Sequence, residues 1–131
     1  MPNGTMLVVE DDDAIRGLLV EYFKEHSDVE VDGARDGAEA LHHVATKVYA
    51  VVLLDLMMPH MSGVDFLASL EALTSDPSLK SIQALPSVFV ITGASDAPCD
   101  EIERRFPALV RGVMRKPLDV HALACRVEAC L

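Results

Sequence analysis

Apolar and polar residues follow one another in a pattern that predicts alternating strands and helices. Short apolar or alternating runs of β-prone residues favour strands. Five segments have this character: 6–9, 29–31, 51–54, 87–92 and 110–115. The run at 51–54 is apolar on consecutive positions, which is typical of a strand buried on both faces. The run at 29–31 alternates, so we expect a partly exposed edge strand that Gly33 closes.

Between these runs, apolar residues recur at helical spacing. The clearest stripe has five members: Ile15, Leu18, Leu19, Tyr22 and Phe23. Similar stripes lie within 38–45, 64–70 and 120–131, the last of which reads most simply as core. Asp12 or Asp13, Asp96 and Asp119 are natural N-caps, and Pro107 should end the fourth helix.

Five strand–helix units predict an α/β fold of one domain over residues 1–131, with a mostly parallel sheet and helices on both faces. Such sheets bind ligands beyond the carboxyl ends of their strands. The residues that directly follow each strand are therefore the candidates for chemistry.

Composition narrows the classes of partner. Eleven basic and 21 acidic residues give a net charge of −10, which argues against binding to nucleic acid or to anionic membranes. No apolar run approaches the ~20 residues that span a bilayer, and the first residues do not resemble a signal peptide. Cys99, Cys125 and Cys130 form no disulfide framework, so we expect small buried side chains and a cytoplasmic protein.

The strand ends carry complementary polar groups. Glu10 and Asp11 follow the first strand, Asp55 ends the third, Thr92 ends the fourth and Lys116 follows the fifth. Clustered carboxylates need compensation, and a hard divalent cation such as Mg²⁺ supplies it. Carboxylates, a divalent ion, a lysine and a hydroxyl together suit phosphoryl transfer, in which a carboxylate can be the covalent acceptor. Asp12 and Asp13 can be explained as helix caps, whereas Glu10 and Asp11 directly follow the strand and are poorly explained that way. Asp55, Thr92 and Lys116 are weak signals when each is taken alone, so the prediction rests on their combination.

Four motifs at these positions resemble the receiver domain of two-component response regulators. They are the acidic run Val8–Asp12, the D-x-x-M-P-x-x-x-G run Asp55–Gly63, the threonine motif Val90–Gly93 and the lysine–proline motif Arg115–Pro117. The resemblance covers about residues 5–131. It implies a doubly wound, flavodoxin-like (βα)5 fold with strand order 2-1-3-4-5.

The resemblance also implies a metal-dependent phosphoacceptor. Asp55 would accept a phosphoryl group from a phosphohistidine of a sensor histidine kinase or a histidine phosphotransfer protein. Mg²⁺ (or Mn²⁺) would be bound directly by Asp11, Asp55 and the backbone carbonyl of Met57, and mainly through water by Glu10. Self-phosphorylation and autodephosphorylation would be its only reactions, so the protein would not be a conventional enzyme.

Further roles follow from the same resemblance. Lys116 would pair with Asp55 at rest, and Thr92 would turn toward the phosphoryl group. The face of the fourth helix, fifth strand and fifth helix would then change conformation, and it is also a candidate homodimer face. The bond between Lys116 and Pro117 would be cis, and Gly63 would serve a turn or a close approach.

The sequence departs from the family at three places. Val113 stands where a switching Tyr or Phe is common, and residues 74–86 form an insertion that is either decoration or a partner site. Met57 and Ala94 occupy the two positions that set phosphoryl lifetime in the family, and neither can orient water, which predicts slow dephosphorylation.

Two other functions remain open to test. A degenerate receiver would be a phosphorylation-independent interaction module, although the retained acids, Thr92 and Lys116 speak against it. A phosphatase of the haloacid dehalogenase class also uses Asp, Lys and Mg²⁺. That class needs a second Asp two residues beyond the nucleophile, where this chain has Met57.

Overall fold

The computed structural model describes residues 4–56, 63–74, 86–93, 99–116 and 119–130. The strands in these ranges are β1 (Thr5–Val9), β2 (Glu30–Ala34), β3 (Val51–Asp55), β4 (Ser87–Thr92) and β5 (Val110–Arg115). The helices are α1 (Asp13–His26), α2 (Gly37–Thr46), α3 (Gly63–Thr74), α4 (Cys99–Arg105) and α5 (Val120–Glu128). Strands and helices therefore alternate as the sequence predicts.

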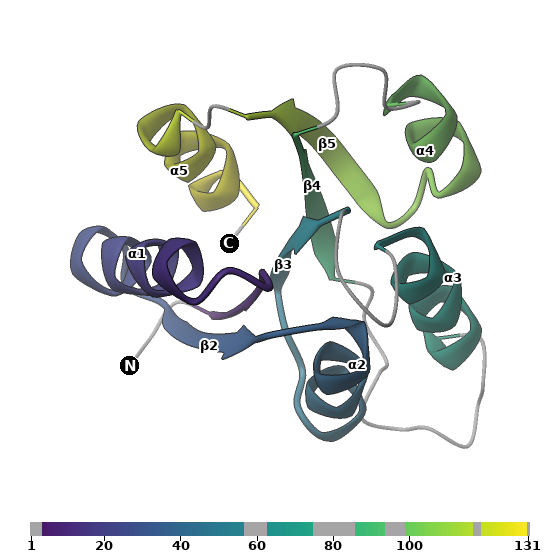
Figure 1. The fold of residues 1–131 in the computed structure, drawn as a ribbon, viewed down its shortest axis with the longest axis horizontal. Helices are drawn as coiled ribbons and strands as arrows, with labels where there is room; N and C mark the ends of the chain where they lie inside the picture. The colour runs from purple at the N-terminus through teal and green to yellow at the C-terminus, as the bar shows by residue number, and fades with distance from the viewer. Residues whose placement is uncertain (1–3, 57–62, 75–85, 94–98, 117–118, 131) are drawn as a thin grey trace.

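The strands form one parallel sheet in the order β2-β1-β3-β4-β5, which confirms the predicted fold (Figure 1). Val9 pairs with Leu54, and Leu54 pairs in turn with Val90. This register brings the carboxyl ends of β1, β3 and β4 to one edge of the sheet. The edge position of β2 also agrees with its alternating sequence.

Helices cover both faces of the sheet. In Figure 1, α1 and α5 lie on one side, whereas α2, α3 and α4 lie on the other. Leu19, Phe23 and Leu123 belong to the apolar core beneath α1 and α5. Phe66 and Phe106 belong to the core on the opposite face. Successive residues of β3 point into alternate cores, which explains why all of its residues are apolar until Asp55.

Aspartates begin three of the helices. The side chain of Asp12 accepts a hydrogen bond from the Ile15 N–H, and Asp119 caps α5 through Ala122. Asp36 caps α2 in the same way. Thus Asp12, rather than Asp13, is the N-cap of α1. The predicted cap at Asp96, the insertion and the Lys116–Pro117 bond involve residues outside the described ranges.

The predicted end of the second strand is wrong. β2 continues to Ala34, so Gly33 lies within the strand, where it pairs with Val8. Glycine usually weakens a strand, so the sequence predicts that the strand ends at Gly33. The structure gives another reason for a glycine here, because the side chain of Arg16 passes directly over it.

Helical periodicity also overestimates burial. On α1, Leu19 and Phe23 are buried, but Leu18 is 70% exposed and Ile15 is 37% exposed. The apolar stripe of α1 is therefore wider than the helix face that is covered. The stripe of α5 is core, as predicted, with Leu123, Ala124 and Val127 buried. The prediction of buried cysteines is wrong for Cys125, which is exposed, whereas Cys130 is half-buried and packs against the core beneath α1 and α5. Among the described residues, no helix combines the length and apolar character that a bilayer span requires.

Candidate functional site

The polar residues predicted at the strand ends converge at one edge of the sheet. Glu10 directly follows β1, Asp55 is the last residue of β3 and Thr92 is the last residue of β4. All three are buried, with exposed fractions of 2%, 2% and 1%. Among the residues that the structure describes, no other polar or charged side chain is buried. Burial of two carboxylates side by side is unfavourable unless a cation compensates their charge.

Three carboxylates lie close enough to share one metal ion. Glu10, Asp11 and Asp55 each offer an oxygen, and these oxygens all lie within 4.8 Å of one another. Asp11 is exposed, so the cluster is open to solvent on one side. Mg²⁺ prefers a few carboxylate oxygens with the remaining positions filled by water or phosphate, and this donor set fits it. The predicted carbonyl ligand of Met57 lies outside the described residues.

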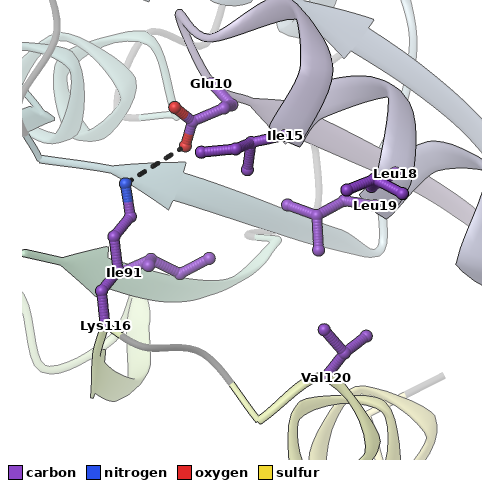
Figure 2. A pocket seen from close by; sticks show the side chains of 7 residues that line it. All are labelled: Glu10, Ile15, Leu18, Leu19, Ile91, Lys116 and Val120. Atoms are coloured by element: carbon purple, nitrogen blue, oxygen red, sulfur yellow. Dashed lines mark ion pairs between the residues drawn. The ribbon is translucent and has the colours of Figure 1, made fainter.

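Lys116 completes the cluster with a positive charge. Its Nζ lies 3.7 Å from Asp55 Oδ2 and 3.8 Å from Glu10 Oε2; Figure 2 shows the second of these pairs. The backbone N–H of Lys116 donates a hydrogen bond of 2.8 Å to the carbonyl of Thr92. The lysine is thus anchored to the end of β4, while its side chain reaches two acids from β1 and β3.

The surroundings of Glu10 raise the pKa of its carboxyl group to about 7. Burial is the largest cause, and the negative charge of Asp55 adds to it. The Asp12 N–H, 3.3 Å from Glu10 Oε1, and the charge of Lys116 offset only part of this effect. Without a metal ion, Glu10 therefore holds its proton at a pH where an ordinary glutamate is ionised.

This shift predicts that the metal-free protein loses stability as pH rises from about 4.5 to 7. In that window folded Glu10 binds its proton more tightly than unfolded Glu10 does, so deprotonation favours unfolding. The loss should reach about 3 kcal/mol, since one pKa unit corresponds to roughly 1.4 kcal/mol. Urea unfolding in EDTA at several pH values measures it.

Glu10→Gln is the control for this effect. It removes the titrating group, so its free energy of unfolding should fall less than that of the wild-type protein across the same window. Parallel pH profiles for the two proteins would show that Glu10 does not titrate as expected. Saturating Mg²⁺ should restore stability at neutral pH, because metal binding favours the ionised carboxylates.

Gly63 provides the predicted close approach beside the site. A Cβ at this position would lie 2.8 Å from Leu56 Cα, and the Gly63 N–H donates to the Leu56 carbonyl over 3.1 Å. Leu56 directly follows Asp55, and its own N–H donates to the carbonyl of Ile91. The start of α3 therefore packs against the backbone next to Asp55, which leaves no room for a side chain.

An apolar cavity opens beside the acids, and sequence reasoning missed it. The cavity has a volume of about 270 Å³. Glu10 and Lys116 lie at one end of the cavity (Figure 2). The rest of its lining is apolar and consists of Ile15, Leu18, Leu19, Ile91 and Val120. The α1 residues face Val120 of α5 across the gap. The sequence gives no distinct signal for this cavity, because the α1 stripe has the spacing of an ordinary core-facing helix.

Comparison with known proteins agrees with this geometry. Residues 6–128 match the response regulator receiver domain family. The regulatory protein VanRB of Enterococcus faecalis is 34% identical over 127 residues, which is 96% of this chain and 51% of that protein. The transcriptional regulatory protein SrrA of Staphylococcus aureus is 42% identical over 59 residues, 45% of this chain and 24% of SrrA. The chain thus spans about half the length of VanRB, and the region that matches SrrA covers about a quarter of SrrA.

Solved structures share the fold over nearly the whole chain. The response regulator TrrA of Thermotoga maritima, in complex with Mg²⁺-BeF, has a TM-score of 0.78 and 26% identity, with 100% of both chains covered. The receiver domain of the Francisella response regulator 1452 has the same TM-score and identity, covering 98% of this chain and 96% of that one. The strand order, the acidic edge and the match over residues 6–128 lead to one conclusion: this chain belongs to the response regulator receiver domain family.

Proposed function

We propose that this chain, as one receiver unit over residues 1–131, accepts a phosphoryl group on Asp55 in a Mg²⁺-dependent reaction. A phosphohistidine of a sensor histidine kinase or of a histidine phosphotransfer protein would be the donor. One observation carries the proposal. Asp55 is buried, shares a cluster of carboxylate oxygens within 4.8 Å with Glu10 and Asp11, and lies 3.7 Å from the ammonium of Lys116.

The described side chains suggest how the transfer would proceed. Glu10, Asp11 and Asp55 would hold the metal ion, with Asp11 as a direct ligand and Glu10 mainly acting through water. Bound Mg²⁺ neutralises the repulsion between the carboxylates and the phosphoryl oxygens. A carboxylate oxygen of Asp55 forms the new bond to phosphorus, and the electron pair of the broken P–N bond returns to the donor's imidazole. Lys116 shifts from the carboxylate to a phosphoryl oxygen.

The switch would follow from Thr92. Its hydroxyl lies at the end of β4, next to the strand that carries Asp55, and would turn to hydrogen-bond the phosphoryl group. This contact would favour a second arrangement of the face that α4, β5 and α5 form. Val113 on β5 has no aromatic ring that could change rotamer, so backbone movement or another residue would carry the change. The same face is the proposed homodimer surface.

The apolar cavity indicates where the donor would dock. Leu18 is 70% exposed and Ile15 is 37% exposed, and both line the cavity that reaches Glu10 and Lys116. A protein that delivers a phosphoryl group to Asp55 must cover this edge of the sheet. The surface around its phosphohistidine would therefore pack apolar side chains against α1 and Val120, with basic groups facing the acids of residues 11–13.

Incubation with Mg²⁺ and acetyl phosphate or phosphoramidate tests this function. Mass spectrometry of the intact protein should show one covalent phosphoryl group, and EDTA should prevent its formation. A degenerate receiver would gain no phosphoryl group even with saturating Mg²⁺. A phosphatase of the haloacid dehalogenase class would instead hydrolyse an added phosphate ester with repeated turnover. Either of these two results would exclude the proposal.

The phosphoryl group on Asp55 should be lost slowly. By resemblance to the family, the side chains at positions 57 and 94 set the rate at which water attacks, and Met57 and Ala94 cannot hydrogen-bond a water molecule. We expect a phosphoryl lifetime of minutes or longer in Mg²⁺ without a phosphatase, and a shorter one for Met57→Asn. Mass spectrometry after removal of the donor measures both, and loss within seconds from the wild-type protein would contradict the expectation.

A further inference from the structure

We propose that Arg16 is a positioning residue for the metal site, because it fixes the backbone that carries Glu10 and Asp11. The inference rests on the proposed function, since it concerns how those two acids are held for Mg²⁺. Arg16 lies on α1 and does not itself belong to the carboxylate cluster. It would act through the peptide group between the two acids.

The guanidinium of Arg16 bridges the end of β1 and the start of α1. Its Nη1 donates a hydrogen bond of 2.9 Å to the backbone carbonyl of Glu10, and its Nη2 forms an ion pair with the Asp13 carboxylate. The side chain of Arg16 is only 18% exposed, whereas that of Asp13 is 83% exposed. The exposed ion pair contributes little energy by itself, so its main effect is to orient the guanidinium.

The carbonyl that Arg16 contacts belongs to the peptide group joining Glu10 to Asp11. This group is planar, so fixing its oxygen limits rotation at both flanking residues. The N–H of Glu10 donates a 3.0 Å hydrogen bond to Ala34 of β2, which holds the preceding peptide. These two contacts define the directions in which the side chains of Glu10 and Asp11 leave the backbone.

Gly33 supplies an independent observation. A Cβ on Gly33 would lie 3.2 Å from Arg16 Cδ and 3.4 Å from Cγ, so the arginine stem lies directly over this residue. A glycine inside a strand costs stability relative to a residue with a side chain. That cost is explained if the strand must leave a channel through which Arg16 reaches the Glu10 carbonyl.

The direction in which Mg²⁺ affinity changes when Arg16 is removed shows whether Arg16 acts by positioning the peptide group or only through its positive charge. If Arg16 acted only through its positive charge, its removal would relieve repulsion and Mg²⁺ would bind more tightly. If Arg16 positions the peptide, its removal lets the two acids turn away and Mg²⁺ binds more weakly. Arg16→Lys keeps the charge, but its single nitrogen cannot hold the Glu10 carbonyl and Asp13 as the fork of arginine does.

The experiment is a calorimetric titration of the full chain with Mg²⁺ alone. We expect about a tenfold weaker affinity for Arg16→Ala, the lower end of the effect of groups that orient metal ligands, and a clear loss for Arg16→Lys. Gly33→Val should also weaken binding, although valine favours strands. Gly17→Ala is the matched control, since no atom lies within 4 Å of its added Cβ. Circular dichroism and urea unfolding establish that each variant is folded.

The possible results separate a failure of the positioning role of Arg16 from a failure of the proposed phosphoacceptor function. If the wild-type protein binds Mg²⁺ and Arg16→Ala binds it equally or more tightly, the positioning role is wrong and the proposed function stands. If the wild-type protein does not bind Mg²⁺, both are wrong. Weaker binding by the Arg16 variants and by Gly33→Val, with Gly17→Ala unchanged, supports the role. At saturating Mg²⁺ the rate of phosphorylation by acetyl phosphate should then return close to the wild-type rate.

Discussion

Asp55→Asn should reduce phosphorylation by acetyl phosphate to the detection limit. The amide has nearly the shape of the carboxylate, so the site should stay intact, but its neutral oxygen is a poor nucleophile. The same change should stabilise the metal-free protein at neutral pH, because the charge of Asp55 contributes to the raised pKa of Glu10. Intact-mass measurement after incubation with the donor gives the first effect, and urea unfolding in EDTA gives the second.

Asp28→Asn is the matched control for this prediction. Asp28 is exposed in the turn between α1 and β2, so the exchange of one acid for its amide there should leave phosphorylation unchanged. A phosphoryl group that persists on Asp55→Asn would show that another residue is the acceptor. Equal loss in both variants would indicate an effect of net charge rather than of the nucleophile.

The site residues could be predicted because a parallel sheet brings the ends of separate strands together, and each strand end can be recognised from its local sequence. Each of Glu10, Asp55 and Thr92 stands at the end of an apolar run, and a parallel sheet places all such ends at one edge. Their separation in the chain does not matter once the strands are recognised. The distances themselves, such as 3.7 Å from Lys116 to Asp55, depend on strand register, which the apolar pattern does not determine.

The errors share a different physical cause. Periodicity shows which residues of a helix are apolar, but not how much of that face another element covers. Leu18 belongs to the apolar stripe of α1 and is nevertheless exposed. Cys125 is also exposed, although a free cysteine is usually buried. The sequence predicts a strand end at Gly33, because the contact with Arg16 across the fold leaves no local signal. Each error marks a place where tertiary packing, or its absence, decides the outcome.

Leu18→Asp should slow phosphotransfer from a phosphohistidine protein by about 30-fold, while phosphorylation by acetyl phosphate stays unchanged. Loss of a hot-spot side chain at the centre of an interface costs about 2 kcal/mol or more, and 2 kcal/mol corresponds to that factor. Leu18 is 70% exposed, so an aspartate there should not disturb the core. The added negative charge would also oppose a partner with basic groups. Parallel time courses with the two donors measure the difference.

Val48→Asp is the matched control, since Val48 is also an exposed apolar residue, at 54%. Its carbonyl accepts a hydrogen bond from Thr5 at the start of β1, which places it at the amino ends of the strands, away from Asp55. We expect normal rates with both donors for this variant. If Leu18→Asp slows both donors equally, Leu18 supports the site itself and not docking. If it slows neither, the partner covers Asp55 without using α1, and the apolar cavity has another role.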